Sequence, residues 1–157
     1  MAKAEVRFVL VGALAVIAWG HERFTRDVDL VPDPDPENLD RLAGVLSELG
    51  GRVKVGDRLL TSDSISMFLK SGDMALVLTE FGQVDVLQGL PHIPRYSEMA
   101  AEAESAIFEG LEVKVCSGRH LLQMKRAASR DQDLLDIEAL LEAHPEWRDP
   151  EWDTGDR

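Results

Sequence analysis

Apolar positions fall into short runs and helical stripes along the first third of the chain. Residues 6–11 form a nearly unbroken apolar run, typical of a strand buried on both faces, and residues 12–20 follow as a short apolar helix between two glycines. A second strand is predicted at residues 26–31, before the proline-rich turn at residues 32–36. Leucines at helical spacing then predict an amphipathic helix over residues 37–49.

Shorter segments with frequent turn residues make up the middle of the chain. Strands are expected at residues 52–55, 64–70, 74–79 and 83–87, turns at 71–73 and 81–82, and a last hairpin at 105–108 and 112–116. A helix is predicted at residues 96–104. Ser117 is a suitable N-cap for a helix that reaches about residue 128, and Asp131 opens another helix that ends near His144.

This order of elements predicts an α/β chain, of the α+β type, with two C-terminal helices. A chain of 157 residues with 45% hydrophobic residues is long enough for one domain with a core. We expect a single domain over residues 1–144, made of a core at 1–116 and a helix pair at 117–144. The last two tryptophans lie in a loosely held acidic tail at residues 145–157.

Acidic residues outnumber basic ones by 29 to 17, so the formal net charge is −12. An average surface of that sign repels phosphates, which argues against generic electrostatic binding of nucleic acid. The excess is concentrated in residues 131–157, with ten acidic and two basic residues, so a local basic site in residues 1–130 stays open. Cys116 is the only cysteine, which favours a buried thiol and a reducing, cytoplasmic setting. The apolar stretch at residues 8–19 is too short to cross a bilayer, so no membrane association is expected.

The sharpest chemical feature is the strand segment that carries Asp27 and Asp29. Side chains two residues apart share one face of a strand, so these carboxylates point together. Paired carboxylates suit a hard divalent cation such as Mg²⁺, although taken alone the pair is more typical of two exposed acids. A later strand adds Asp85 as a lone acid among apolar residues, where a buried carboxylate needs a partner or a metal.

Two more features favour a site for phosphates. The apolar helix that starts at Gly12 presents unpaired backbone N–H groups to an anion. Lys125, Arg126 and Arg130 form a basic cluster in an acidic chain and can neutralise a triphosphate. The alternative for this cluster is a solvated helix face paired to the acids that open the next helix.

Together these features resemble the nucleotidyltransferase superfamily, with the polymerase-β-like fold, and more closely its small bacterial type IV toxin and abortive-infection members. Gly12-Ala13-Leu14-Ala15 is similar to the Gly-Gly-x-Ala motif of that group, with Ala13 in place of the second glycine. The segment from Gly20 to Leu30 is similar to Gly-x-x-Arg-x-Thr-x-Asp-x-Asp-Leu. The segment from Leu122 to Asp136 is similar to a helix pair with Lys…Arg-x-x-Asp-x-x-Asp, so the resemblance covers residues 6–141.

The resemblance implies a mixed β-sheet flanked by helices and the transfer of a nucleoside monophosphate from an NTP to an acceptor hydroxyl. It also implies two Mg²⁺ ions, or Mn²⁺ in their place, because two metals can stabilise both the attacking and the leaving oxygen. Asp27 and Asp29 would bridge the ions. Asp85 would complete the ion near the acceptor and could help to deprotonate its hydroxyl.

Nucleotide-binding residues are implied at Gly12, Ala13, Arg23, Lys125, Arg130 and Asp133. The glycine and the alanine would present backbone N–H groups to the β and γ phosphates, and Lys125 would contact the triphosphate. Arg130 and Asp133 either orient Lys125 or the nucleotide, or join the two helices by an ion pair. Near the site, Trp19, Phe24 and Phe81 are expected to pack in the core.

The acceptor and the partners stay open at the level of the sequence. We expect a toxin of a toxin–antitoxin pair that modifies RNA or protein, with an antitoxin protein as its partner. One alternative is an antibiotic-modifying nucleotidyltransferase, whose small acceptor needs no basic surface. Another is a catalytically silent nucleotide-binding or interaction domain with the same fold.

Overall fold

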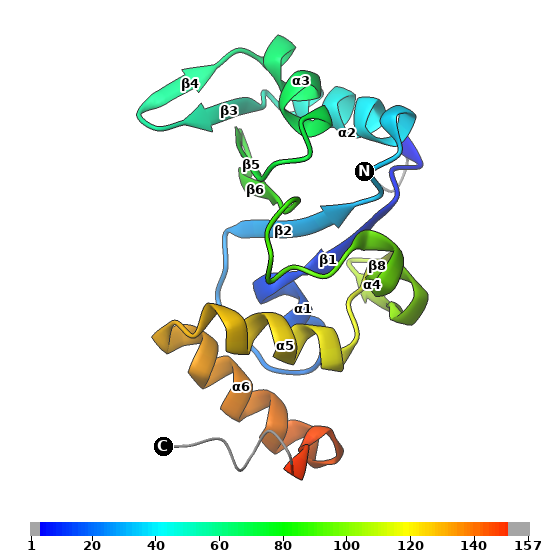
Figure 1. The fold of residues 1–157 in the computed structure, drawn as a ribbon, viewed down its shortest axis with the longest axis vertical. Coiled ribbons are helices and arrows are strands. Elements are labelled where there is room, and N and C mark those ends of the chain that lie inside the picture. The colour runs from blue at the N-terminus through cyan, green and yellow to red at the C-terminus, as the bar shows by residue number, and fades with distance from the viewer. Residues whose placement is uncertain (1–3, 151–157) are drawn as a thin grey trace.

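The computed structural model describes residues 4–150, which form a mixed eight-stranded sheet with helices on both faces (Figure 1). The strands lie in the order β4-β3-β5-β6-β2-β1-β8-β7. In chain order the elements are β1 (Phe8–Val11), α1 (Gly12–Ala18), β2 (Asp27–Pro32), α2 (Pro36–Glu48), β3 (Arg52–Val55), β4 (Arg58–Leu60), η2 (Ser62–Ser64), α3 (Ile65–Lys70), β5 (Ala75–Thr79), β6 (Gly82–Val86), α4 (Tyr96–Glu102), β7 (Glu104–Phe108), β8 (Leu111–Val115), α5 (Gly118–Ala128), α6 (Asp131–Ala143) and η3 (Pro145–Trp147).

Strands β1 and β2 lie at the centre of the sheet. Strand β2 pairs antiparallel with β1 and parallel with β6, while β1 also pairs parallel with β8. Alternation along β2 sends Leu30 into a core that includes residues of α2 and α3, and Val31 into a second core that includes residues of α1, α5 and α6. Both faces of the central strands are therefore covered, which explains the unbroken apolar run of β1.

The predicted fold class is confirmed, but the strand expected at residues 64–70 is wrong. Most of this segment is the helix α3, in which Ile65 and Leu69, one turn apart, are fully buried and pack with residues of α2. The alternation of serine and apolar residues at its start imitates a strand, but burial of two positions four residues apart requires a helix. Residues 71–73 therefore connect a helix to β5 instead of forming a hairpin.

Strand β4 was not predicted from the sequence. It pairs antiparallel with β3 through the two-residue turn Gly56-Asp57, in which Gly56 has a positive φ of 57°. A Gly-Asp pair between short strands is a typical hairpin signal, so this turn could have been found from the sequence.

The C-terminal helices end in η3, which packs back on the fold. The ring of Trp147 lies 4.8 Å from that of Trp19 and stacks on His144, with 4.0 Å between the ring centroids. Trp147 is thus packed against the core, whereas Trp152 of the expected tail lies outside the described residues. Cys116 is buried directly after β8, as predicted, and burial raises the pKa of its thiol to about 12. In residues 4–150, no helix has the length and apolar character needed to cross a membrane.

Candidate active site

The three carboxylates singled out in the sequence lie on one face of the sheet. In the parallel pair of β2 and β6, Asp29 is directly opposite Asp85, and Asp27 is opposite Gln83. Residues in register point to the same face, and alternation sends the intervening Val28 and Val84 to the opposite face. The structure therefore brings the Asp-x-Asp pair and the lone acid together, as the alternation of polar and apolar residues predicts.

Gly12 lets the start of α1 approach the Asp29 carboxylate. It has a positive φ of 63°, and a Cβ at this position would lie 2.0 Å from Asp29 Oδ2. Only glycine fits such a conformation and such a close approach. The backbone N–H of Ala13 donates to the Asp29 carboxylate, so the start of this helix already faces an anionic oxygen.

Burial and mutual repulsion make it costly to ionise this group of acids. Burial raises the pKa of Asp29, and the charge of Asp27 raises it further. Burial also raises the pKa of Asp85 to about 6. The hydrogen bond from Gln83 Nε2 at 2.8 Å lowers this pKa, and repulsion from Asp29 and Asp27 raises it. Crowded carboxylates with raised pKa values are typical of a site that a cation or a proton neutralises.

Lys125 stands on the opposite wall, in a buried ion-pair network between α5 and α6. Its ammonium donates to Asp133 Oδ1 at 2.9 Å and to Asp136 Oδ2 at 2.7 Å, and all three side chains are almost completely buried. Burial raises the pKa of Asp133, but hydrogen bonds from Arg130 and Lys125 outweigh that effect and leave it at about 2. The expected pairing of the basic cluster with acids of the next helix is therefore present, but Lys125 is buried instead of solvated, whereas Arg130 is exposed.

The loop between α1 and β2 joins the same network. Arg23 Nη1 donates to Asp136 Oδ2 at 2.5 Å, and Gln132 Nε2 donates to Asp136 Oδ1 at 3.0 Å. At the end of the loop, Thr25 Oγ1 accepts the backbone N–H of Asp27 at 3.2 Å. The loop that leads to Asp27 is thus held by side-chain hydrogen bonds at its middle and near its end.

Two adjoining cavities lie between the carboxylates and the basic wall. One has a volume of about 230 Å³ and a polar lining that includes every residue predicted for the site, together with Thr25 and Gln132. The other has a volume of about 440 Å³ and shares Asp29, Asp85 and Lys125 with the first, but apolar residues such as Leu87 and Met124 cover much of its wall. The site therefore has a charged part and an apolar part that meet at Asp29 and Asp85.

The donor set fits a hard cation. Carboxylate oxygens are the ligands that Mg²⁺ and Mn²⁺ take, and the raised pKa values of Asp29 and Asp85 indicate uncompensated negative charge. Within residues 4–150, no three His, Cys, Asp or Glu side chains are already close enough to form a complete ligand set. A bound cation would therefore have to draw the carboxylates closer together.

Sequence reasoning missed or misplaced several residues near the site. Phe24 and Phe81 were expected in the core, but they are 77% and 80% exposed because their loop and turn lie beyond the ends of the strands. Trp19 packs as expected and donates its indole N–H to the Cys116 carbonyl at 2.9 Å. Asp136 was quoted only as part of a motif, although it is fully buried and accepts from Lys125 and Arg23. Its spacing of three residues from Asp133, which places both acids on one side of α6, was the signal for it.

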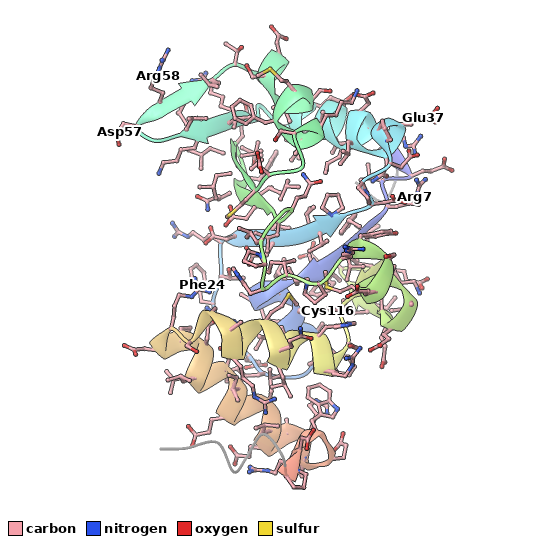
Figure 2. All side chains as sticks on the ribbon, in the orientation of Figure 1. Arg7, Phe24, Glu37, Asp57, Arg58 and Cys116 are labelled. Atoms are coloured by element: carbon pink, nitrogen blue, oxygen red, sulfur yellow. The ribbon has the colours of Figure 1, made fainter. Side chains whose placement is uncertain are left out.

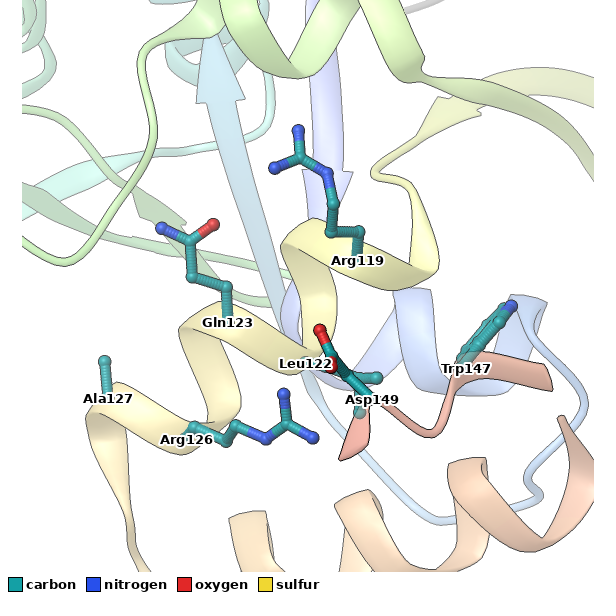
Figure 3. Close-up of a pocket in the computed structure, with 7 residues that line it drawn as sticks. All are labelled: Arg119, Leu122, Gln123, Arg126, Ala127, Trp147 and Asp149. Carbon is teal, nitrogen blue, oxygen red and sulfur yellow. The ribbon is translucent and has the colours of Figure 1, made fainter. Parts of the chain in front are cut away.

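A separate cavity of about 650 Å³ lies on another face of α5 (Figure 3). It is lined by Leu122 and Arg126 of that helix and by Trp147 and Asp149 from the chain after α6. None of the predicted site residues reaches it. Arg126 therefore faces away from the carboxylates, although it is adjacent to Lys125 in the sequence.

Comparison with known proteins identifies the fold. No family model matches the chain, and no curated protein matches its sequence. Its structure is similar to that of the lincosamide antibiotic adenylyltransferase LnuA bound to lincomycin, with a TM-score of 0.61, 15% identity and coverage of 87% of this chain and 86% of the other. It is also similar to ANT(2'')-Ia in complex with adenylyl-2''-tobramycin, with a TM-score of 0.59, 14% identity and coverage of 90% and 81%. The fold expected from the sequence is thereby confirmed.

Proposed function

We propose that this protein is a metal-dependent nucleotidyltransferase that moves a nucleoside monophosphate from an NTP to an acceptor hydroxyl. The observation that carries the proposal is the register of Asp29 with Asp85, which places three carboxylates on one sheet face beside the start of α1. Fold alone does not establish an activity, so the proposal depends on these side chains. The structures of LnuA and ANT(2'')-Ia are consistent with it, because the first protein is named as an adenylyltransferase and the second is in complex with an adenylylated antibiotic.

The carboxylates and the basic residues, on opposite walls of the site, would have different roles. Asp27 and Asp29 would hold Mg²⁺ or Mn²⁺ with Asp85, and these cations stabilise charge on the attacking and leaving oxygens when they are bound. Gly12 and Ala13 would turn backbone N–H groups to the β and γ phosphates, for which the Ala13 N–H would leave the Asp29 carboxylate. Lys125, Arg23 and Arg130, held in place by Asp133 and Asp136, would supply the positive field around the triphosphate.

The bond changes of the proposed reaction balance without a further reactant. The acceptor oxygen bonds to the α-phosphorus, the bond from that phosphorus to the bridging oxygen breaks, and pyrophosphate leaves. Asp85 would accept the proton of the acceptor hydroxyl, because a carboxylate beside that hydroxyl can act as its general base.

For the acceptor we propose RNA or protein, as in a toxin of a toxin–antitoxin pair with a protein antitoxin. A second candidate is a small molecule such as an antibiotic. The cavity of about 440 Å³ beside Asp85 favours this second candidate, because its size and apolar wall fit a drug-sized acceptor.

The test is a transfer assay with each labelled NTP and Mg²⁺, in which total RNA, protein extract or a panel of antibiotics is the acceptor. We expect label in one acceptor class with wild type and none with Asp29→Asn. Asp57→Asn, which removes an exposed acid at the far tip of the β3–β4 hairpin, is the matched control and should transfer like wild type. Absence of transfer to every acceptor, with NTP and metal bound, would favour the silent binding domain.

A further inference from the structure

An uncovered part of the sheet continues from the carboxylates towards its β4 edge. Register places Asp85 opposite Leu76 of β5, Leu76 opposite Lys54 of β3, and Lys54 opposite Leu59 of β4. The next row runs from Gln83 through Leu78 to Arg52. Adjacent strands are about 4.8 Å apart, so the Lys54 backbone lies about 10 Å from that of Asp85. The two rows thus connect Asp85 with Lys54 and Gln83 with Arg52 on one face of the sheet.

These side chains face solvent, not a core. Arg52, Lys54 and Leu59 are exposed, whereas Val53 and Val77, which point the opposite way, are buried under α2 and α3. In the part of the chain that the structure describes, neither Arg52 nor Lys54 has an ion-pair partner. In a protein with a net charge of −12, carboxylates are available to pair with most cations. Two cations without an ion pair, in register with the site, are therefore unusual for this chain.

Two exposed aromatic side chains lie at the end of the sheet where the parallel strands β2 and β6 begin, next to the row from Gln83 to Arg52. Phe24, seen at the molecular edge in Figure 2, is 77% exposed, and Phe81 in the β5–β6 turn is 80% exposed. Arg26 lies over the Phe24 ring at 5.5 Å from its centroid and has no ion pair within residues 4–150. Gly82 approaches the Arg26 carbonyl so closely that a Cβ would lie 2.6 Å from it, which places the Phe81 turn beside Arg26.

Exposed aromatics close to unpaired cations are features that bind single-stranded nucleic acid, because rings stack on bases and cations neutralise phosphates. We propose that this surface, formed by Phe24, Arg26, Phe81, Arg52 and Lys54, binds the single-stranded 3′ end of an RNA as the acceptor. The inference rests on the proposed nucleotidyl transfer and names its acceptor. The small number of cations limits contact to the strand end and leaves the acidic remainder of the molecule to repel a duplex.

Gln83 favours RNA over DNA. Its amide nitrogen donates to Asp85, so its amide oxygen remains as an acceptor between Asp85 and Asp27 on the same face, with no donor among the described residues. A terminal ribose with its 3′-hydroxyl at Asp85 can donate its 2′-hydroxyl to this oxygen. A deoxyribose cannot make that hydrogen bond.

The experiment measures binding of a 5′-fluorescein single-stranded RNA 12-mer by anisotropy, without NTP and with EDTA. We expect Phe24→Ala and Phe81→Ala each to weaken binding about 5- to 100-fold, which is the usual loss for one stacked base. Three phosphate contacts give a slope of log affinity against log salt of about −2, which the Arg52→Ala/Lys54→Ala double variant should reduce to about −0.7. Arg58→Ala, on the opposite face of the same hairpin, and Ile107→Ala, an exposed apolar residue of β7, should bind like wild type.

Several results would overturn the proposal. One is the absence of RNA binding at low salt. Others are an equal loss of RNA affinity with Arg58→Ala and unaltered RNA binding by the phenylalanine variants. A further one is an affinity for heparin, for duplex RNA or for single-stranded DNA of the same sequence that equals the affinity for the RNA 12-mer. Circular dichroism melts show whether each variant folds. Because the assay contains neither NTP nor metal, it tests the surface apart from the activity. RNA binding without transfer would overturn the proposed activity and the acceptor role but not the binding surface, whereas transfer to a small molecule without RNA binding would overturn only this surface.

Discussion

Lys125→Met tests whether the buried network holds the basic wall of the site together. The ammonium of Lys125 bridges Asp133 and Asp136 at 2.9 and 2.7 Å, and methionine keeps the apolar stem while removing the charge. Removing one partner of a buried ion pair costs about 3–5 kcal/mol, because the remaining charge stays out of water without compensation. Here each carboxylate keeps another cation, Arg130 or Arg23, so we expect the lower end, about 3 kcal/mol.

The chain contains a matched control for this substitution. Lys70 pairs with Asp40 at the same 2.7 Å, but its side chain is 41% exposed and that of Asp40 is 52% exposed. An exposed pair contributes about 0–1 kcal/mol, since water already solvates both charges. For a chain of this size 1 kcal/mol shifts the melting temperature by about 2–4 °C, so we expect Lys125→Met to lower it by about 6–12 °C and Lys70→Met by less than about 4 °C.

The assay is a thermal melt followed by circular dichroism at pH 7 and again near pH 4. In Lys125→Met, Asp133 loses one of the hydrogen bonds that lower its pKa, so at the lower pH it can take up a proton and the difference from wild type should shrink. Equal losses for the two lysine variants at pH 7 would refute the reasoning, because buried and exposed pairs would then have the same value.

Three further predictions concern the carboxylate wall. Asp27→Asn should melt slightly higher than wild type without divalent cations, because it relieves repulsion on Asp29, and it should gain less stability from added Mg²⁺. Asp85 has a folded pKa of about 6, above its value of about 3.9 in an unfolded chain, so its contribution to stability is present below pH 4 and lost as the pH rises through 6. Without metal, the melting temperature of Asp85→Asn should therefore change less with pH over that range than that of wild type. Gly12→Ala should cost about 1–2 kcal/mol from backbone strain and also displace Asp29, with loss of the stabilisation by Mg²⁺.

Matched variants separate these effects from general ones. Gly110→Ala carries the same kind of backbone strain, at a φ of 82°, but a Cβ there meets nothing within 4 Å. It should lose stability without losing the response to Mg²⁺. A full response to Mg²⁺ in Gly12→Ala or in Asp27→Asn would contradict the assignment of the cation to this wall.

The sequence by itself determined the acidic wall of the site. A strand has a period of two residues, so Asp27 and Asp29 had to share a face, and the apolar neighbours of Asp85 fixed its direction in the same way. Local rules also located the C-terminal helices, since Ser117 caps α5 by accepting the backbone N–H of His120. These features depend on residues close in the chain, which a single sequence contains.

Tertiary structure decided what depends on distant neighbours. Lys125 and Arg126 are adjacent in the sequence, yet only packing of α6 on α5 buries the lysine between Asp133 and Asp136. The same dependence made α3 a helix, because α2 buries one face of it, and left Phe24 exposed, because no element covers its loop. Burial and ion pairing are set by groups that other elements bring near, so local pattern could propose these residues but could not assign their surroundings.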